Sequence, residues 1–186
     1  ILHRALSSGD YSAGSVTPTF TPSMDIQVSS NFERLLFDAG GRDGAALAEQ
    51  MHRFEAIKVM QLTNRQREAA AALFTSARAD QTETARAMQW ASRNAGQVID
   101  PHTAVGLHAA RAVAMAGDIP SDVPIVTLAT AHPAKFREAV ERAIGVRPAL
   151  PARVGDLFGR EEHFTTLGGD YASARDFVLG HAARRA

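Results

Sequence analysis

The sequence contains no cysteine, which excludes a disulfide framework, a thiolate zinc site and a cysteine nucleophile. It has no excess of either charge, because 20 basic and 20 acidic residues cancel, and we therefore expect no nucleic-acid partner. No apolar run approaches the roughly 20 residues that a membrane span needs, so we expect no membrane partner and a cytoplasmic location. The 186 residues are 45% hydrophobic, enough for the core of one domain.

The chain opens with Ile1 and not with methionine, and neither a signal peptide nor a transit peptide follows. We therefore expect a piece of a longer protein. Residues 7–23 are rich in Ser, Gly, Thr and Pro without any period, which predicts a long loop that is either functional or flexible. A capping box at 30–33 then predicts a helix that Gly40 ends.

Signals for helix starts recur between residues 43 and 96. Apolar residues three or four positions apart predict a first helix over about 43–60. Capping boxes at 63–66 and 80–83 predict two more, and Gly96 offers a left-handed stop. We interpret residues 43–96 as one helical unit.

The pattern changes beyond this unit to an alternation of strands and helices. Asp100 starts a helix that is expected to reach about residue 116. Residues 123–129 are apolar almost throughout, as in a buried parallel strand, and the turn at 130–133 leads into another helix. A second such alternation begins at 163–167, so an α/β layer architecture is favoured over a helical bundle.

Two helix starts are candidate binding positions. Thr130 follows the strand candidate, and side chains at the carboxyl end of a parallel strand face the crevice where ligands bind. Asp100 and His102 open the helix before it. For all three residues, the alternative is a purely structural role as helix caps. None of the seven histidines has a second one four residues away, so we expect no metal site.

Three segments, residues 23–35, 100–106 and 130–136, resemble in order and spacing the C-terminal part of threonine synthase in its longer bacterial and fungal form. The resemblance implies an α/β fold, the C-terminal part of the three-layer domain of pyridoxal phosphate (PLP) enzymes of fold type II, which are tryptophan synthase β-like. Residues 1–186 would be the C-terminal portion of that large cofactor-binding domain, with 43–96 as a helical insertion within it.

The implied activity is the PLP-dependent conversion of O-phospho-L-homoserine and water to L-threonine and phosphate. In the family, a G-N-F-G loop holds the cofactor phosphate and a lysine forms the Schiff base, and both precede the segment present here. The two lysines of this chain, Lys58 and Lys135, do not match that lysine. We therefore expect no catalytic residue and no covalent cofactor in this segment, which would be inactive without the missing N-terminal part.

The resemblance also assigns site residues. Thr130 would donate a hydrogen bond to the pyridine nitrogen of PLP, and Asp100 and His102 would lie beside the same ring. It leaves Asn31, Arg34 and the loop at 7–23 without a role. Two alternatives stay open, a related PLP lyase acting on another phosphorylated substrate and a non-catalytic helical interaction domain.

Overall fold

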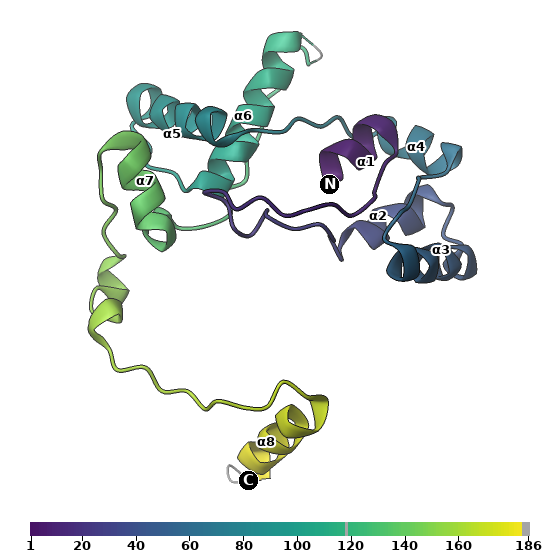
Figure 1. Cartoon of the computed structure of the whole chain (residues 1–186). Coiled ribbons are helices and arrows are strands. Elements are labelled where there is room, and N and C mark those ends of the chain that lie inside the picture. Colours follow the sequence, from purple (N-terminus) through teal and green to yellow (C-terminus); the bar gives the residue numbers. More distant parts are fainter. Residues whose placement is uncertain (118, 184–186) are drawn as a thin grey trace. The chain divides into compact units, whose positions relative to one another are not determined.

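In the computed structural model, residues 1–117 and 119–183 are described, and their regular elements are helices (Figure 1). The α-helices are α1 (Leu2–Ser8), α2 (Phe32–Ala39), α3 (Gly44–Ile57), α4 (Asn64–Ala71), α5 (Gln81–Ala95), α6 (Pro101–Ala116), α7 (Arg137–Ile144) and α8 (Tyr171–Ala183). Three short 3₁₀ helices are η1 (Pro133–Phe136), η2 (Ala152–Val154) and η3 (Leu157–Gly159). None of the helices in this part of the chain is long and apolar enough to cross a membrane.

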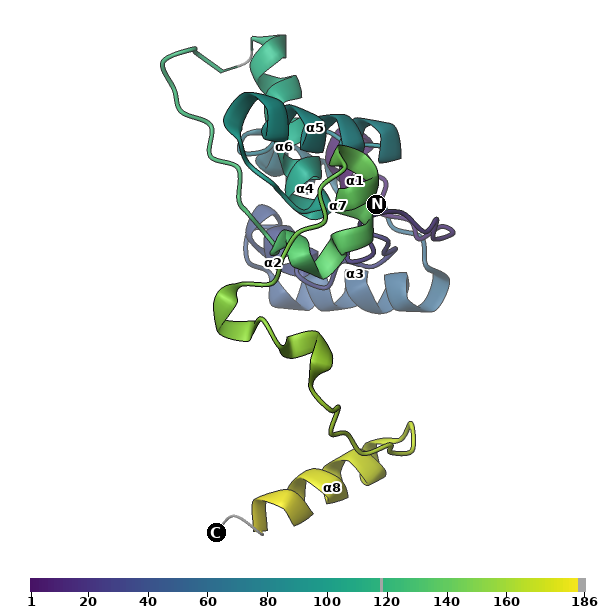
Figure 2. The ribbon, with the colours of Figure 1, turned by 90° about the vertical axis from the view of Figure 1, so that its left-hand side faces the viewer.

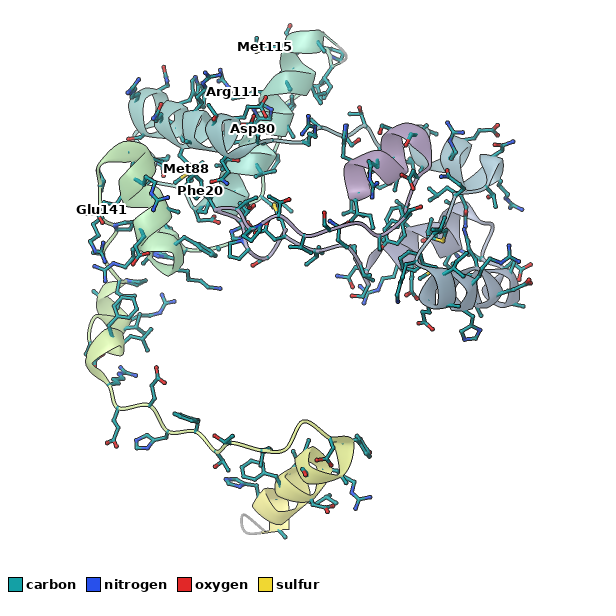
Figure 3. The ribbon with its side chains drawn as sticks, viewed as in Figure 1. Phe20, Asp80, Met88, Arg111, Met115 and Glu141 are labelled. Carbon is teal, nitrogen blue, oxygen red and sulfur yellow. The ribbon has the colours of Figure 1, made fainter. Side chains whose placement is uncertain are left out.

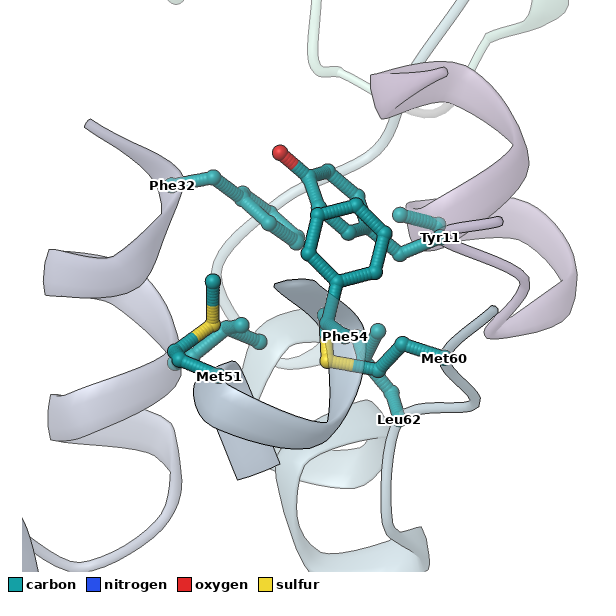
Figure 4. Packing of buried hydrophobic residues seen from close by; sticks show 8 residues of the cluster. Tyr11, Phe32, Met51, Phe54, Met60 and Leu62 are labelled. Atoms are coloured by element: carbon teal, nitrogen blue, oxygen red, sulfur yellow. The ribbon is translucent and has the colours of Figure 1, made fainter. Parts of the chain in front are cut away.

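Helices α1, α2 and α3 and the segments that follow α1 and α3 share one apolar core, which we call the first cluster (Figure 4). Its buried residues are Ala5, Tyr11, Phe32, Leu36, Met51, Phe54, Met60 and Leu62. The ring of Tyr11 stacks on Phe32 with 4.9 Å between centroids and lies 5.1 Å from Phe54. Backbone hydrogen bonds from Tyr11 to Met60 and from Leu62 to Gly9, each 2.9 Å long, hold the residues after α1 alongside the α3–α4 connection.

Helix α5 packs on α6 and on α7, and the three helices contribute to a second cluster of Ala87, Met88, Ala104 and Val140 (Figures 1 and 2). Two of these residues are alanines, which allow a close approach of α5 and α6. Met88 is enclosed within this cluster, whereas Met115 projects from the exposed end of α6 (Figure 3).

Packing divides the helices of residues 43–96 between two groups of helices. Helices α3 and α4 contact α2, whereas the contacts of α5 are with α6 and α7. The chain also separates into two compact units at Leu150. In the second unit, no described residue is buried.

The predicted helix ends are mostly confirmed. Thr63 with Gln66 and Asp80 with Glu83 form complete capping boxes, and Gly96 ends α5 in a left-handed conformation. The capping box predicted at 30–33 is wrong, because Asn31 occupies the N-cap position and makes no side-chain cap. Backbone carbonyls supply the acceptors there, since the N–H of Phe32 donates to Ser29 at 3.0 Å.

Neither predicted strand forms within the described residues of this chain. Residues 123–129 are irregular without a ladder, and so are residues 163–167. The β-bridge between Asp10 and Gln61 is the one pairing of this kind within residues 1–117 and 119–183. A β-strand exists only when a neighbouring strand accepts and donates its backbone hydrogen bonds, and an apolar run does not say where that neighbour is.

Candidate functional site

Asp100 is fully buried at the N-cap of α6, where its carboxylate accepts several hydrogen bonds. Oδ1 accepts from the backbone N–H of His102 at 2.9 Å, and Oδ2 accepts from the hydroxyl of Thr103. The backbone N–H of Thr103 lies 3.4 Å from each oxygen. Bonds from N–H groups and the positive end of the helix dipole offset the desolvation of the carboxylate, so an aspartate can occupy this enclosed position.

The imidazole of His102 connects Asp100 to the loop before α2. Its Nδ1 lies 3.1 Å from Oδ1 of Asp100, and its Nε2 accepts from the backbone N–H of Ser23 at 3.3 Å. Because Nε2 serves as an acceptor and a carboxylate has no proton to give, we assign the ring proton to Nδ1. The ring also contacts Phe136 of η1, with 4.5 Å between centroids.

Thr130 is exposed, and its backbone is held by the helix beside it. Its N–H donates to Oγ of Thr103 at 3.0 Å, and the two threonine oxygens are 3.5 Å apart. The proton of the Thr103 hydroxyl is already donated to Asp100. The hydroxyl proton of Thr130 therefore has one internal acceptor, at the limit of hydrogen-bond length, and is available to a ligand.

The structure thus brings the three predicted residues, Thr130, Asp100 and His102, into one hydrogen-bonded cluster. Thr103 joins them through its hydrogen bonds and was not among the predicted site residues, because threonine in the first turn after an aspartate cap has an ordinary structural explanation. Asn31, the N-cap residue of α2, and Arg34 within α2 are both exposed, and α2 packs on α3 and α4. The loop at 7–23 contacts two parts of the molecule. Tyr11 lies in the first cluster, and the backbone N–H of Ser23 donates to His102.

Both lysines are exposed and lie beside aromatic rings of their own segments. Nζ of Lys58 is 5.8 Å from the ring of Phe54, and Nζ of Lys135 is 5.9 Å from that of Phe136. Exposure gives neither amine the desolvated setting that activates a lysine nucleophile. Among the described residues, no three His, Asp or Glu side chains gather in a way that could hold a metal ion.

Comparison with known proteins identifies relatives of the whole chain. A sequence model of the family "Threonine synthase, C-terminal" matches residues 103–178. The threonine synthase of Pseudomonas aeruginosa is 45% identical over 99% of this chain and 39% of its own length. The resemblance to the C-terminal part of threonine synthase is confirmed. The fungal threonine synthase of Eremothecium gossypii is 37% identical over 84% of the chain and 35% of its own length.

Solved structures of threonine synthase share the fold. The PLP-bound threonine synthase from Brucella melitensis superposes with a TM-score of 0.83 at 40% identity, covering 97% of this chain and 38% of that one. Threonine synthase from yeast gives a TM-score of 0.82 at 27% identity, covering 98% of this chain and 40% of that one. The chain thus spans about two fifths of the length of the threonine synthases that it matches.

Proposed function

We propose that this chain is the C-terminal portion of a threonine synthase, which converts O-phospho-L-homoserine and water to L-threonine and phosphate with the help of PLP in the cytoplasmic biosynthesis of threonine. The identity of 45% to a threonine synthase over nearly the whole chain supports this proposal. One observation carries the assignment of Thr130: the residue is exposed, its backbone N–H is bonded to Thr103, and its hydroxyl has one internal partner, 3.5 Å away.

The residues present fit one end of PLP, its pyridine nitrogen. When bound, PLP withdraws electrons from the reacting bonds of an amino-acid substrate. Thr130 would hold the ring nitrogen by donating its hydroxyl proton. A neutral hydroxyl leaves that nitrogen largely unprotonated, whereas a carboxylate would keep it protonated and make the ring a stronger electron acceptor. The hydroxyl of Thr130 therefore suits elimination and replacement chemistry in which electron withdrawal is tempered.

The groups that hold the other end of PLP would come from the rest of the polypeptide. In our proposal, the phosphate-binding loop and the Schiff-base lysine precede residue 1, and this chain alone is inactive. The exposed positions of Lys58 and Lys135 support the proposal that the Schiff-base lysine lies in the preceding part of the polypeptide. Residues 43–96 would be a helical insertion in the large cofactor-binding domain. Within this insertion, α3 and α4 pack on α2, whereas α5 packs on α6 and α7.

The same division accounts for the missing strands. We propose that residues 123–129 join a parallel sheet whose other strands come from the preceding part of the enzyme, which completes the three-layer α/β domain. Val123, Ile125, Val126 and Leu128 are all exposed in this chain, although their side chains are apolar. A strand buried on both faces of such a sheet needs side chains of this kind.

The test is the replacement of Thr130 by valine in the intact protein. Thr130→Val keeps the branched shape and removes the hydroxyl, so we expect PLP to stay bound and turnover of O-phospho-L-homoserine to fall. A hydrogen bond worth about 0.5–1.5 kcal/mol predicts a loss of roughly 2- to 12-fold, or more if the ring nitrogen is left unpaired. The measurement is release of phosphate together with formation of threonine.

Thr127→Val is the matched control, because Thr127 lies in the same segment and its hydroxyl makes no hydrogen bond within the described residues. We expect its turnover to be unchanged. Full activity of Thr130→Val would remove Thr130 from the site. If the unmodified protein formed no threonine but used another phosphorylated substrate, it would be a related lyase instead.

A further inference from the structure

Among the described residues, the hydroxyl of Thr103 is the one group that bonds both to the buried carboxylate of Asp100 and to the exposed turn at Thr130. It lies in the first turn of α6, donates to Oδ2 of Asp100 and accepts from the N–H of Thr130 at 3.0 Å. We propose that Thr103 is a positioning residue, which fixes the Thr130 hydroxyl for the reaction without touching the cofactor itself. This inference rests on the proposed function.

The direction of each hydrogen bond follows from the number of protons available. The Asp100 carboxylate can only accept, so the one hydroxyl proton of Thr103 is directed to it. The Thr103 oxygen is thereby left with its lone pairs facing Thr130, and it accepts the N–H of that residue. A hydroxyl that donates to a carboxylate is a stronger acceptor in turn, which strengthens the bond to Thr130.

Asp100 cannot face the ligand directly, because it is 0% exposed and its oxygens are occupied by the first turn of α6. Its effect on Thr130 passes through Thr103. His102 extends the same network to the Ser23 turn, since its two ring nitrogens bind Asp100 and the N–H of Ser23. The carboxylate therefore determines how the Thr103 hydroxyl points.

The turn has few other polar restraints. Thr130 lies beyond the proposed strand at 123–129, and over residues 130–132 its N–H is the one backbone donor with an acceptor among the described residues. His132 caps its own helix by accepting from the N–H of Ala134 at 3.1 Å, which does not tie the turn to α6. Loss of the Thr103 oxygen would thus release the orientation of the Thr130 side chain.

Thr103→Val, Thr103→Ala and Thr103→Ser in the intact protein test the inference. Valine replaces the hydroxyl with a methyl group beside the carboxylate, and alanine removes the hydroxyl without adding one. Serine keeps the hydroxyl and lacks only the methyl group of threonine. The matched control is Thr84→Val, because Thr84 is also buried behind an aspartate cap, 3% exposed against 6% for Thr103, and its hydroxyl bonds only to the carbonyl of Asp80.

Two readouts are compared across these variants. The first is amide hydrogen exchange at Thr130 in the cofactor-free protein, which we expect to quicken roughly fivefold or more in Thr103→Val and Thr103→Ala. The second is the kinetics with O-phospho-L-homoserine, in which we expect kcat to fall several-fold while KM changes little. Thr103→Ser should recover both values, and Thr84→Val should change neither, even if its thermal stability falls.

Unchanged exchange at Thr130 in the variants that lack the hydroxyl would overturn the inference. So would a loss of kcat in Thr84→Val equal to that in Thr103→Val, because the effect would then be one of general stability. An unmodified protein that forms no threonine would instead overturn the proposed function, and the exchange experiment does not depend on that activity.

Discussion

Tyr11 shows how one side chain can serve both the core and the backbone. Its ring lies between Phe32 and Phe54, and its hydroxyl accepts from the N–H of Ser29 at 2.7 Å and donates to the carbonyl of the same residue at 3.2 Å. Burial raises the pKa of the Tyr11 phenol above its ordinary value of 10. The neutral form is therefore favoured in the folded state.

Tyr11→Phe is expected to lower the free energy of unfolding by about 0.5–1.5 kcal/mol near neutral pH, because the partly buried N–H of Ser29 loses its acceptor. The raised pKa means that the stability contributed by the neutral phenol is fully present below pH 10 and is lost as the pH rises through the folded-state value. The difference in the free energy of unfolding between the unmodified and Tyr11→Phe proteins should thus narrow as the pH rises above 10. Denaturant unfolding at a series of pH values measures this difference. Two stability curves that stay parallel with pH would contradict the prediction.

At the scale of elements, the helix starts are local devices that work without distant contacts. At the start of α4, Oγ of Thr63 accepts from the N–H of Gln66 at 3.2 Å, and Oε1 of Gln66 accepts from the N–H of Thr63 at 3.0 Å. Gln66 also donates to Oε1 of Gln50 at 2.9 Å, which joins α4 to α3. This box therefore contributes to packing as well as to the helix end.

Thr63→Ala should lower the free energy of unfolding by about 1 kcal/mol, the usual effect of losing an N-cap side chain. Thermal or denaturant unfolding of the chain measures it. Thr82→Ala is the control, since Thr82 is exposed in the first turn of α5 and is not the N-cap residue. Equal losses in the two variants would show that the Thr63 cap contributes nothing of its own.

At the scale of the whole molecule, the chain leaves a large apolar surface in contact with water. The irregular segment 123–128 presents apolar side chains, among them Leu128 with 74% exposure. Contiguous apolar surface of this kind marks sites of association. In the proposed enzyme, the rest of the polypeptide covers it.

The chain of residues 1–186 is therefore expected to self-associate, and Leu128→Asp should weaken that association by placing a charge in the segment. Leu73→Asp is a matched control at 78% exposure, outside this segment. Sedimentation velocity over a range of concentrations measures both variants. An unmodified chain that stays monomeric throughout would contradict the expectation.

The site was predictable only in part. Asp100 as a helix cap follows from its place before Pro101, and Thr130 and His102 were expected from the resemblance to threonine synthase. The contact between Thr103 and Thr130 was not predictable, because the two residues are 27 positions apart along the chain. Neither could the contact between His102 and Ser23 be foreseen, since these residues are 79 positions apart.

What the sequence determined by itself is local. Helix starts and stops such as Thr63, Asp80 and Gly96 depend on atoms a few residues apart, so the hydrogen bonds that form them lie within one short segment. Only the tertiary structure decided that α5 packs on α6 and not on α3 and α4, and that residues 123–129 form no ladder within this chain. Both outcomes depend on which surfaces meet, because apolar burial is not directional and a strand requires a neighbour.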